Sequence, residues 1–435
     1  MEVRLTNPGW IQSIVVLSMI AIQSLLLYVI PRSNFYGTFG LFLALFALYI
    51  FIVKSEKYFS FTSCIVLAIV LRLIALFALP ALSDDYFRFI WDGRMVIGHV
   101  NPYQYTPQEY LQIHPGDIYL KYLYENMNSP EYHTIYPPVL QYLFSFAVLL
   151  FPKNAYNAVL IMKLFILLAE CVTIRILYLY AKLKGIEVRN ILWYVLNPLI
   201  IIELTGNVHF EGVLLCFFIS ALYYLERKRN VPSAILWGLS IATKFTPLII
   251  APILLPYLGL KKFFKYGLVS LVIVSLLFIP FINKHLIGDL NSSVKLFYHL
   301  FEFNASVIYF VRWVGYHFVS YDIMEFMAPV LGVISFVFIL IISWWPSKKE
   351  GLIEKSIWVF FVYFLFSTML HPWYTSTLIL LSVFSRYKFP VVFSLLVLLS
   401  YFPYGLKIYE ENLAVIAIEY SLLFGYIIWE KFSVP

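Results

Sequence analysis

Long runs of apolar residues recur along the whole chain, separated by short polar segments. A helical run of about 20 apolar residues crosses the hydrocarbon core of a bilayer. A helix also pairs every backbone polar group within its own segment, as lipid requires. The pattern therefore predicts an all-α polytopic membrane protein, with candidate spans at residues 11–30, 37–53, 61–82, 157–181, 190–204, 210–225, 231–247, 248–258, 266–281, 323–345, 355–370, 373–385, 389–402 and 413–430.

One further apolar run, residues 139–151, is shorter and lies between Pro138 and Pro152. Its length is typical of a re-entrant or interfacial segment. If this run does not cross, both chain termini and eighteen of the 31 Lys and Arg residues fall on one side, which the positive-inside rule makes cytoplasmic. These residues are Arg4, Lys54, Lys57, Lys182, Lys184, Arg189, Arg227, Lys228, Arg229, Lys261, Lys262, Lys265, Lys348, Lys349, Lys355, Arg386, Lys388 and Lys431.

The composition agrees with a protein of the cell membrane, because 62% of the 435 residues are hydrophobic and 13% are charged. No repeat or linker divides the chain, so we expect one integral membrane domain over residues 1–435, with the first run retained as a helix. Cys64, Cys171 and Cys216 lie in apolar runs and indicate neither disulfides nor a metal site. No basic, aromatic-rich patch indicates a nucleic-acid partner.

The assigned orientation brings four polar segments to the extracytoplasmic side. They are SDDYFRFIWDGR (83–94), TGNVHFEG (205–212), HLFEFNASVIYFVRW (299–313) and HPWY (371–374). The first begins a loop, residues 83–138, that is much longer than the other connections, and such loops are usually functional. Its helical pattern from Tyr86 to Val96 predicts juxtamembrane amphipathic helices.

Asp84 and Asp85 stand where a predicted span meets this loop. One interpretation is helix capping by Ser83 or Asp84, since negative charge is favourable at a helix N-terminus. The other is a general base that accepts a proton from a hydroxyl, with one carboxylate raised in pKa by its like-charged neighbour.

Several cations are expected near this acid pair. Arg72 lies inside a predicted span, where facing lipid is costly, so it is expected to face protein as an ion-pair partner or anion ligand, unless it snorkels. Lys244, Arg312 and His371 end or follow apolar runs on the loop side, and His209 lies at the same level. Such a set suits a phosphate leaving group, although each residue alone is typical of the interface.

No P-loop, GxGxxG, HExxH, CxxC or GxSxG motif occurs, so nucleotide hydrolysis, hydride transfer, zinc proteolysis and serine esterase chemistry have no sequence basis. The sequons at Asn291 and Asn304 matter only in a eukaryotic lumen.

The block SDDYFRFIWDGRMVIGHVNPY, followed by YPP (136–138), NPL (197–199), HFE (209–211), ATKFTP (242–247), FNAS (303–306) and HPWY (371–374), resembles the polyprenyl-phosphate-mannose-dependent mannosyltransferases of the GT-C superfamily. The resemblance covers roughly residues 61–405 and is strongest to the bacterial and archaeal branch, more distantly to the first GPI mannosyltransferase. It implies a GT-C fold in which a large external loop carries the essential acid. That acid is Asp85, with Asp84 second.

The same resemblance implies transfer of a hexose, mannose above all, from a polyprenyl-phosphate donor to a lipid or glycan acceptor hydroxyl, with inversion. Residues 1–60 would form two accessory spans, residues 61–405 the catalytic core and residues 406–435 a C-terminal span. Donor phosphate would bind Lys244, Arg312, His371 and Arg72. Substrate would bind His209, Glu211, Tyr86, Trp91, Arg94, Tyr103 and Trp373.

No cofactor is required by this mechanism, and a divalent cation bridging the two aspartates and phosphate stays an alternative. A transporter or flippase of lipid-linked sugars is the rival function. Proline interruptions at Pro198 and Pro247 favour it, while the lack of an internal repeat does not.

Overall fold

The computed structural model describes residues 9–284, 286, 288, 302–319, 321–347 and 350–433, with only the backbone of Glu325. The Asn291 sequon, residues 299–301 of the third polar segment, and Arg4, Lys348 and Lys349 lie outside these residues. Within them the protein is all-helical, as predicted, apart from an isolated bridge between Phe303 and Met369.

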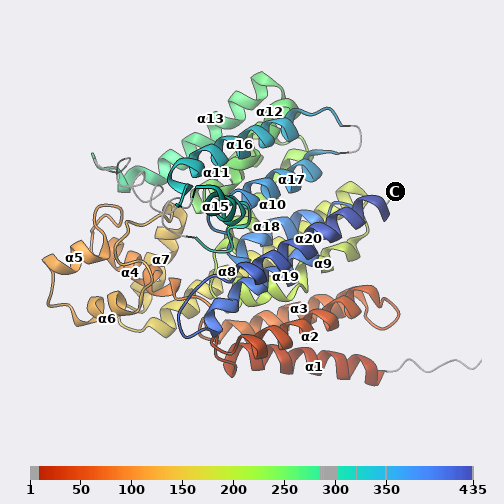
Figure 1. The fold of residues 1–435 in the computed structure, drawn as a ribbon, viewed down its shortest axis with the longest axis horizontal. Helices are drawn as coiled ribbons and strands as arrows, with labels where there is room; N and C mark the ends of the chain where they lie inside the picture. Colours follow the sequence, from red (N-terminus) through yellow and green to blue (C-terminus); the bar gives the residue numbers. More distant parts are fainter. Residues whose placement is uncertain are drawn as a thin grey trace, which may run out of the picture.

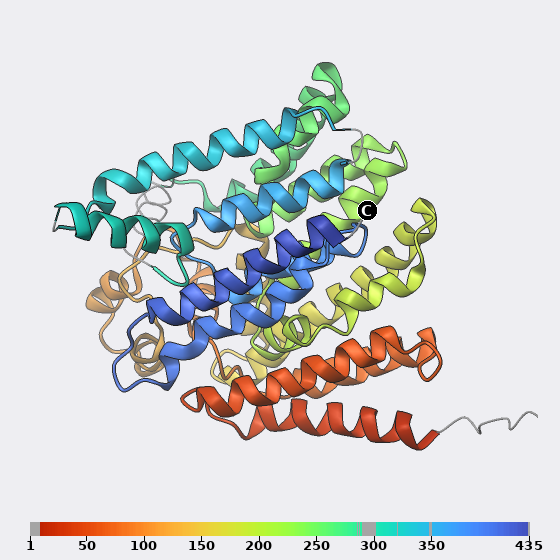
Figure 2. The ribbon, with the colours of Figure 1, turned by 45° about the vertical axis from the view of Figure 1, so that its right-hand side comes forward.

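The first part of the bundle contains three helices, and a long eighth helix packs beside them (Figures 1 and 2). These helices are α1 (Gly9–Tyr28), α2 (Phe35–Lys54), α3 (Phe61–Leu76) and α8 (Ala155–Lys184). Asn34 begins α2 by accepting a hydrogen bond from the Gly37 amide at 3.0 Å, and Ser60 begins α3 in the same way. Gly185 ends α8 at a φ of +66°, a left-handed conformation that glycine adopts without steric cost.

The long loop is folded into short helices at one end of the bundle (Figure 1). These are α4 (Asp85–Ile97), α5 (Pro107–Ile113) and α6 (Ile118–Asn126), which are followed by α7 (Pro138–Leu150). The helix predicted from Tyr86 to Val96 is thus confirmed. Gly93 lets α4 lie directly on α7, because a Cβ there would come within 2.6 Å of the Phe144 carbonyl oxygen.

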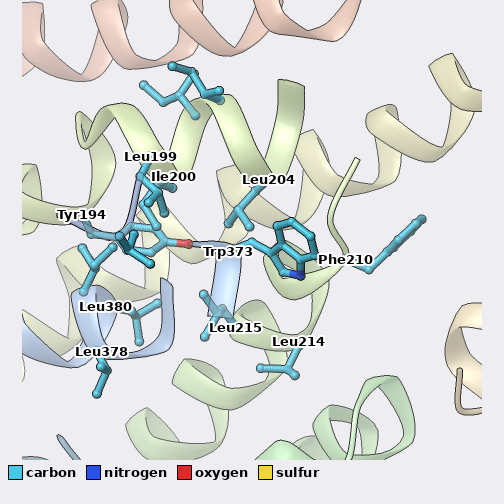
Figure 3. Close-up of a cluster of buried hydrophobic side chains, with 14 of the residues drawn as sticks. Tyr194, Leu199, Ile200, Leu204, Phe210, Leu214, Leu215, Trp373, Leu378 and Leu380 are labelled. Atoms are coloured by element: carbon cyan, nitrogen blue, oxygen red, sulfur yellow. The ribbon is translucent and has the colours of Figure 1, made fainter. Parts of the chain in front are cut away.

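The middle of the bundle contains a broken span. Residues Val188–Val195 (η1, Val188–Ile191, and α9, Leu192–Val195) and the π-helical turn η2 (Ile200–Gly206) meet at a bend of 58°, with Pro198 in the break. Together with α10 (Glu211–Glu226) and α18 (Ser376–Ser382), η2 encloses a buried apolar cluster (Figure 3). Phe210 and Trp373 form the end of this cluster that reaches the site described below.

The second half of the chain packs on α10 through two of its helices, α11 and α18. Its elements are α11 (Asn230–Thr243), η3 (Thr246–Ile250), α12 (Ala251–Leu258), α13 (Leu260–Phe278), η4 (Ile279–Phe281), α15 (Ser306–Val319), α16 (Met324–Trp344), α17 (Leu352–Leu365), η5 (Pro372–Thr375), α18, α19 (Phe389–Leu396), η6 (Val397–Gly405) and α20 (Leu413–Ser433). Among the described helices five are long and apolar enough to cross a membrane, or six if the bent pair is one span. Many of the fourteen predicted spans are therefore shorter or interrupted helices.

A fully buried ion pair ties α3 to α8. Arg72 Nη2 lies 2.8 Å from Glu170 Oε2, and both side chains are 0% exposed. Arg72 also donates to the Val195 carbonyl at 2.7 Å, and Tyr194 donates to Glu170 at 2.7 Å. Every strong polar group of the pair is engaged, which offsets the cost of burying two charges.

The two ends of the bundle differ in content (Figures 1 and 2). Helix α1 begins and α20 ends at one end, and α4–α6 lie at the other. The two described ends of the chain therefore lie away from the short helices of the long loop.

Candidate active site

A cavity of about 870 Å³ opens beneath α4 and the end of the long loop. Its walls come from segments far apart in the sequence: the α1–α2 turn, residues 128–137, the starts of α10 and η5, the end of α11, and the segment after η6. Seven of the predicted site residues line it: Asp84, Asp85, His209, Glu211, Lys244, His371 and Trp373.

The acid pair is held by backbone and side-chain contacts at the start of α4. Asn207 Oδ1 accepts from the Ala81 and Leu82 amides, each at 3.0 Å, and so fixes the turn that leads into the helix. Asp84 is the residue before the helix, but its side chain makes no capping hydrogen bond. It pairs instead with Arg32 at 2.7 Å, so Asp84 occupies the N-cap position without a capping side chain, whereas Ser83 Oγ accepts a hydrogen bond from the Asp85 amide at 3.3 Å.

Asp85 has a different environment from its neighbour. Its Oδ1 accepts a hydrogen bond from Asn128 Nδ2 at 2.9 Å, and no ion pair to it occurs among the described residues. The carboxylate acts electrostatically on Lys244 and Tyr374, which approach from other elements of the same cavity. The acid and the lysine are thus brought together, as the sequence predicted.

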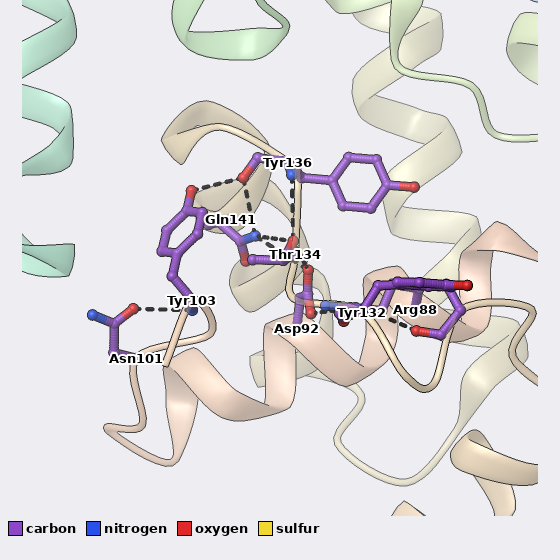
Figure 4. A network of polar contacts seen from close by, with 9 residues as sticks. Arg88, Asp92, Asn101, Tyr103, Tyr132, Thr134, Tyr136 and Gln141 are labelled. Atoms are coloured by element: carbon purple, nitrogen blue, oxygen red, sulfur yellow. Dashed lines mark hydrogen bonds and ion pairs between the residues drawn. The ribbon is translucent and has the colours of Figure 1, made fainter. Parts of the chain in front are cut away.

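A buried polar network fixes the loop that carries Asn128 (Figure 4). Arg88 pairs with Asp92 at 2.8 Å and donates to the carbonyls of Ser129 and Tyr132. The other Asp92 oxygen accepts from Thr134 at 2.5 Å. Since α4 supplies both charges, the same helix positions Asp85 and the wall that faces it.

Lys244 follows α11 and is the cation of the cavity with the closest aromatic contact. Its ammonium pairs with Glu211 of α10 and lies 4.0 Å from the centroid of the Tyr374 ring. Glu211, Tyr374 and Asp85 all favour the charged form of this lysine, against the effect of burial. The Lys244 side chain remains 29% exposed toward the cavity.

Two histidines stack on Trp373. The ring of His209 lies 3.5 Å from it at an interplanar angle of 15°, and the ring of His371 lies 4.3 Å from it at 2°. Burial, together with the nearby His209 and Lys244, lowers the pKa of His371 to about 3. His371 is therefore neutral at physiological pH and offers hydrogen bonds rather than charge. His209 Nε2 and His371 Nδ1 are buried without a hydrogen-bond partner in the described chain, as expected of groups that bind a ligand.

The structure does not bring two of the predicted phosphate ligands to the cavity wall. Arg72 forms a fully buried ion pair with Glu170 and does not reach the cavity. Arg312 donates two hydrogen bonds to Glu302, which does line the cavity, and its Nε lies 3.2 Å from Asp322. Both arginines are therefore neutralised by carboxylates: Arg72 by the buried Glu170, and Arg312 by Glu302 of the cavity wall and by Asp322.

Four predicted substrate residues also lie elsewhere. Trp91 is 1% exposed and packs against Tyr110, and Tyr103 is buried with its hydroxyl bonded to the Tyr136 carbonyl. Arg94 pairs with Asp117 at 3.1 Å. Tyr86 contacts Phe87 rather than the cavity. All four side chains belong to the packing of the long loop.

The cavity residues that were not selected from the sequence include Arg32, Asn128, Tyr374 and Tyr404. Tyr374 belongs to the HPWY segment and was within reach of motif reasoning. Arg32 and Asn128 carry no local signal, because their partners lie 52 and 43 positions away. No group of three or more His, Cys, Asp or Glu side chains in the described chain is arranged to hold a metal ion.

An apolar groove of about 540 Å³ adjoins the polar cavity. It runs between η3 and α12 on one side and α15, α16 and α17 on the other. Four residues line both spaces: Ile249, Tyr363, Ser367 and Thr368. The cavity that contains the charged residues and the apolar groove therefore lie side by side, an arrangement that suits an amphipathic ligand.

A polytopic helical bundle whose external loop supplies acids to such a cavity has the features that the GT-C resemblance implies, and it defines the class as an integral membrane glycosyltransferase. The chain belongs to the alpha-(1->6)-mannopyranosyltransferase family, because residues 6–259 match the family's N-terminal domain. The match includes α1 and α2, which the sequence resemblance had set apart as accessory.

Curated relatives agree with this family. The chain is 22% identical over 347 residues to alpha-(1->6)-mannopyranosyltransferase A of Corynebacterium glutamicum, covering 73% of this chain and 69% of that protein. It is 21% identical over 321 residues to the protein of the same name from Mycobacterium tuberculosis, covering 69% of this chain and 61% of that protein. No solved structure matches the chain.

Proposed function

We propose that this mannosyltransferase takes mannose from a polyprenyl-phosphate donor and transfers it to an acceptor hydroxyl by a single inverting displacement. The observation that carries the proposal is the joint placement of Asp85 and Lys244 on one cavity that continues into an apolar groove. A base, a cation and a lipid channel are the three parts that this reaction needs.

The donor fits the two adjoining spaces. Its prenyl chain would occupy the groove between α12 and α16, and its phosphate would lie near Ser367 and Thr368, where groove and cavity meet. Lys244 would stabilise the negative charge of the departing phosphate, with neutral His371 as a hydrogen-bond donor. A lipid phosphate is already a good leaving group, so no acid is needed behind it.

The reaction would proceed in one step. The acceptor oxygen attacks the anomeric carbon, its proton passes to Asp85, and the bond from that carbon to the phosphate oxygen breaks with the electron pair leaving on the polyprenyl phosphate. One displacement inverts the anomeric centre, so a β-linked donor would yield an α-linked product. The two relatives are named for an α-(1->6) linkage, which agrees with this outcome.

The loop end of the bundle would face outward. The cytoplasmic loops hold most of the lysines and arginines, and α1 begins and α20 ends at the end opposite to α4–α6. Acceptor would then arrive at the extracytoplasmic surface, and the acceptor would be a lipid or glycan exposed there.

The rival function is export of a lipid-linked sugar, and the broken span at Pro198 favours it. Discontinuous helices in transporters usually come as a pair in two related repeats. Among the described helices only one bent pair is long and apolar enough to form such a discontinuous span. A flippase would bind the same phosphate but would not need Asp85.

The experiment compares wild type with Asp85→Asn in membranes supplied with labelled polyprenyl-phosphate mannose and an acceptor glycan. Transfer should fall by about 10²–10⁴-fold, because the general base is lost. Glu125→Gln is the matched control, since Glu125 is an exposed acid of the same loop that pairs with Lys121. Undiminished transfer by Asp85→Asn would refute the base. If wild-type membranes translocate the lipid-linked mannose but transfer none of it to the acceptor, the flippase is favoured.

A further inference from the structure

The turn between α1 and α2 places one arginine in the active-site wall. Arg32 Nη1 lies 2.7 Å from Asp84 Oδ2, and its guanidinium lies 5.6 Å from the centroid of the Tyr404 ring. Arg32 and Ser33 both line the main cavity. The two N-terminal helices thus reach the site through a single short turn.

The turn is fixed by packing and not by this ion pair alone. Phe35, the first residue of α2, meets Phe402 edge to face at 5.2 Å. A Cβ added to Gly405 would come within 3.1 Å of the Phe35 Cβ, which shows how closely η6 and α2 approach. Arg32 is therefore held at the entrance to α4 by apolar contacts that do not involve Asp84.

The two adjacent aspartates face different partners as a result. Asp84 is neutralised by a cation, whereas Asp85 accepts one hydrogen bond from a neutral amide. Two unbalanced carboxylates on neighbouring residues would oppose each other's ionisation. Arg32 balances the charge of Asp84, so the two carboxylates do not face each other without a counter-ion.

We propose that Arg32 is a positioning residue of the glycosyl transfer reaction: it holds the Asp84 carboxylate and balances its charge, and it leaves Asp85 as the carboxylate of the two that has no counter-ion among the described residues and can accept the proton. This inference rests on the proposed function. It assigns to the N-terminal helix pair a part in catalysis that the accessory interpretation did not contain.

Stability alone does not account for the pair. The side chains of Arg32 and Asp84 are 41% and 37% exposed, and ion pairs of that exposure add little to folding stability. Variants of Arg32 are therefore expected to fold, so a change in their transfer rate would not result from unfolding.

The pH test must consider every charged or titratable group that acts on Asp85. These groups come from α4, the long loop, the end of α11, η5 and η6, and they are Asp84, Tyr136, Lys244, Tyr374, Tyr401 and Tyr404. Asp84 is the acidic residue among them, so the loss of its counter-charge is the change expected to act on the acid side of the profile.

The experiment measures the pH dependence of kcat/KM for mannose transfer in wild type, Arg32→Gln, Arg32→Lys and the double variant Arg32→Gln/Asp84→Asn. Arg32→Gln should move the acid limb upward by about one pH unit, which lowers kcat/KM about tenfold at pH values below the limb and changes it little well above it, because Asp84 then disfavours the ionised base. Arg32→Lys should keep most of the activity. The double variant should return the limb to its wild-type place.

Lys57→Gln is the matched control, since it removes a charge from the turn between α2 and α3, outside the cavity. A wild-type profile in Arg32→Gln would overturn the inference. So would a loss of activity with an unmoved acid limb, which would indicate a purely structural role. If Arg32→Gln fails to fold, Asp84→Asn tests the same charge balance and should not raise the limb. Undiminished transfer by Asp85→Asn would instead refute the proposed base, whatever Arg32 does.

Discussion

Two charged clusters in this protein contain similar residue types and have opposite properties. The pair of Arg72 and Glu170 inside the bundle is 0% exposed, and its polar atoms are engaged by Val195 and Tyr194. The cavity cluster is partly open and incompletely paired. Buried charges that are fully satisfied hold helices together, whereas polar groups left without partners are available to a substrate.

The difference is clearest at the atoms without partners. In the cavity, His209 Nε2 and His371 Nδ1 have no partner in the described chain, and the Lys244 side chain is 29% exposed. In the bundle, the guanidinium of Arg72 makes four hydrogen bonds, two of them to Glu170. We therefore expect substitutions in the cavity to change rate and substitutions in the bundle to change stability.

Lys244→Met should have the largest effect on rate among the cations of the two clusters. Loss of the cation that faces the phosphate is expected to lower kcat by about 10²–10³-fold. The single variant also leaves Glu211 unpaired, so Lys244→Met/Glu211→Gln serves as the control: its melting temperature should recover while transfer stays low. Wild-type transfer in the double variant would contradict a role in leaving-group stabilisation.

Arg72→Met should have the largest effect on stability. Removing one partner of a buried ion pair costs about 3–5 kcal/mol, because the other charge is left without compensation. Chemical or thermal unfolding in detergent measures this loss, and Arg72→Met/Glu170→Leu should regain most of it. If folded Arg72→Met instead keeps its stability and loses kcat, Arg72 binds donor and the comparison between the two clusters fails.

A smaller effect is expected from Glu411, which lies in the segment between η6 and α20. Burial raises the pKa of its carboxyl to about 7 in the folded protein, while hydrogen bonds from Asn304 and Tyr409 act in the opposite direction. A raised folded-state pKa favours folding at low pH, and this contribution is lost as the pH rises through about 7. The melting temperature should therefore decline between pH 5 and 8, and Glu411→Gln should flatten that decline.

Chelation is expected to have the smallest effect. If Lys244 supplies the positive charge at the phosphate, treatment with EDTA should change the transfer rate by less than about twofold. Loss of activity that returns with added Mg²⁺ or Mn²⁺ would show that a divalent cation shares this task, as in the alternative that bridges Asp84 and Asp85.

The membrane fold was largely predictable from the apolar pattern. Runs such as residues 11–30 and 413–430 correspond to α1 and α20, and the proline-bounded run after Pro138 forms the separate helix α7. The breaks were less predictable, because a segment that is apolar on every side shows no periodicity that marks where a helix bends. The π-helical turn η2 lies in such a segment.

The site was predictable where chemistry and loop position coincide in one motif. Asp85, His371 and Trp373 belong to the polar segments selected from the sequence, Lys244 belongs to ATKFTP, and all four line the cavity. Arg312 was misplaced because a sequence shows a charge but not its partner, here Glu302. Arg32 was missed for the same reason.

The contact at Gly93 has a consequence for how this enzyme is expected to turn over. The backbone of α4 packs closely against the backbone of α7. Asp85, in the first turn of α4, therefore belongs to a packed helix and not to a mobile lid. We therefore expect the proposed base, Asp85, to stay in place while both substrates come to it. Exchange of one long lipid for another through the channel beside α16 then becomes the step on which the speed of the whole cycle is expected to depend.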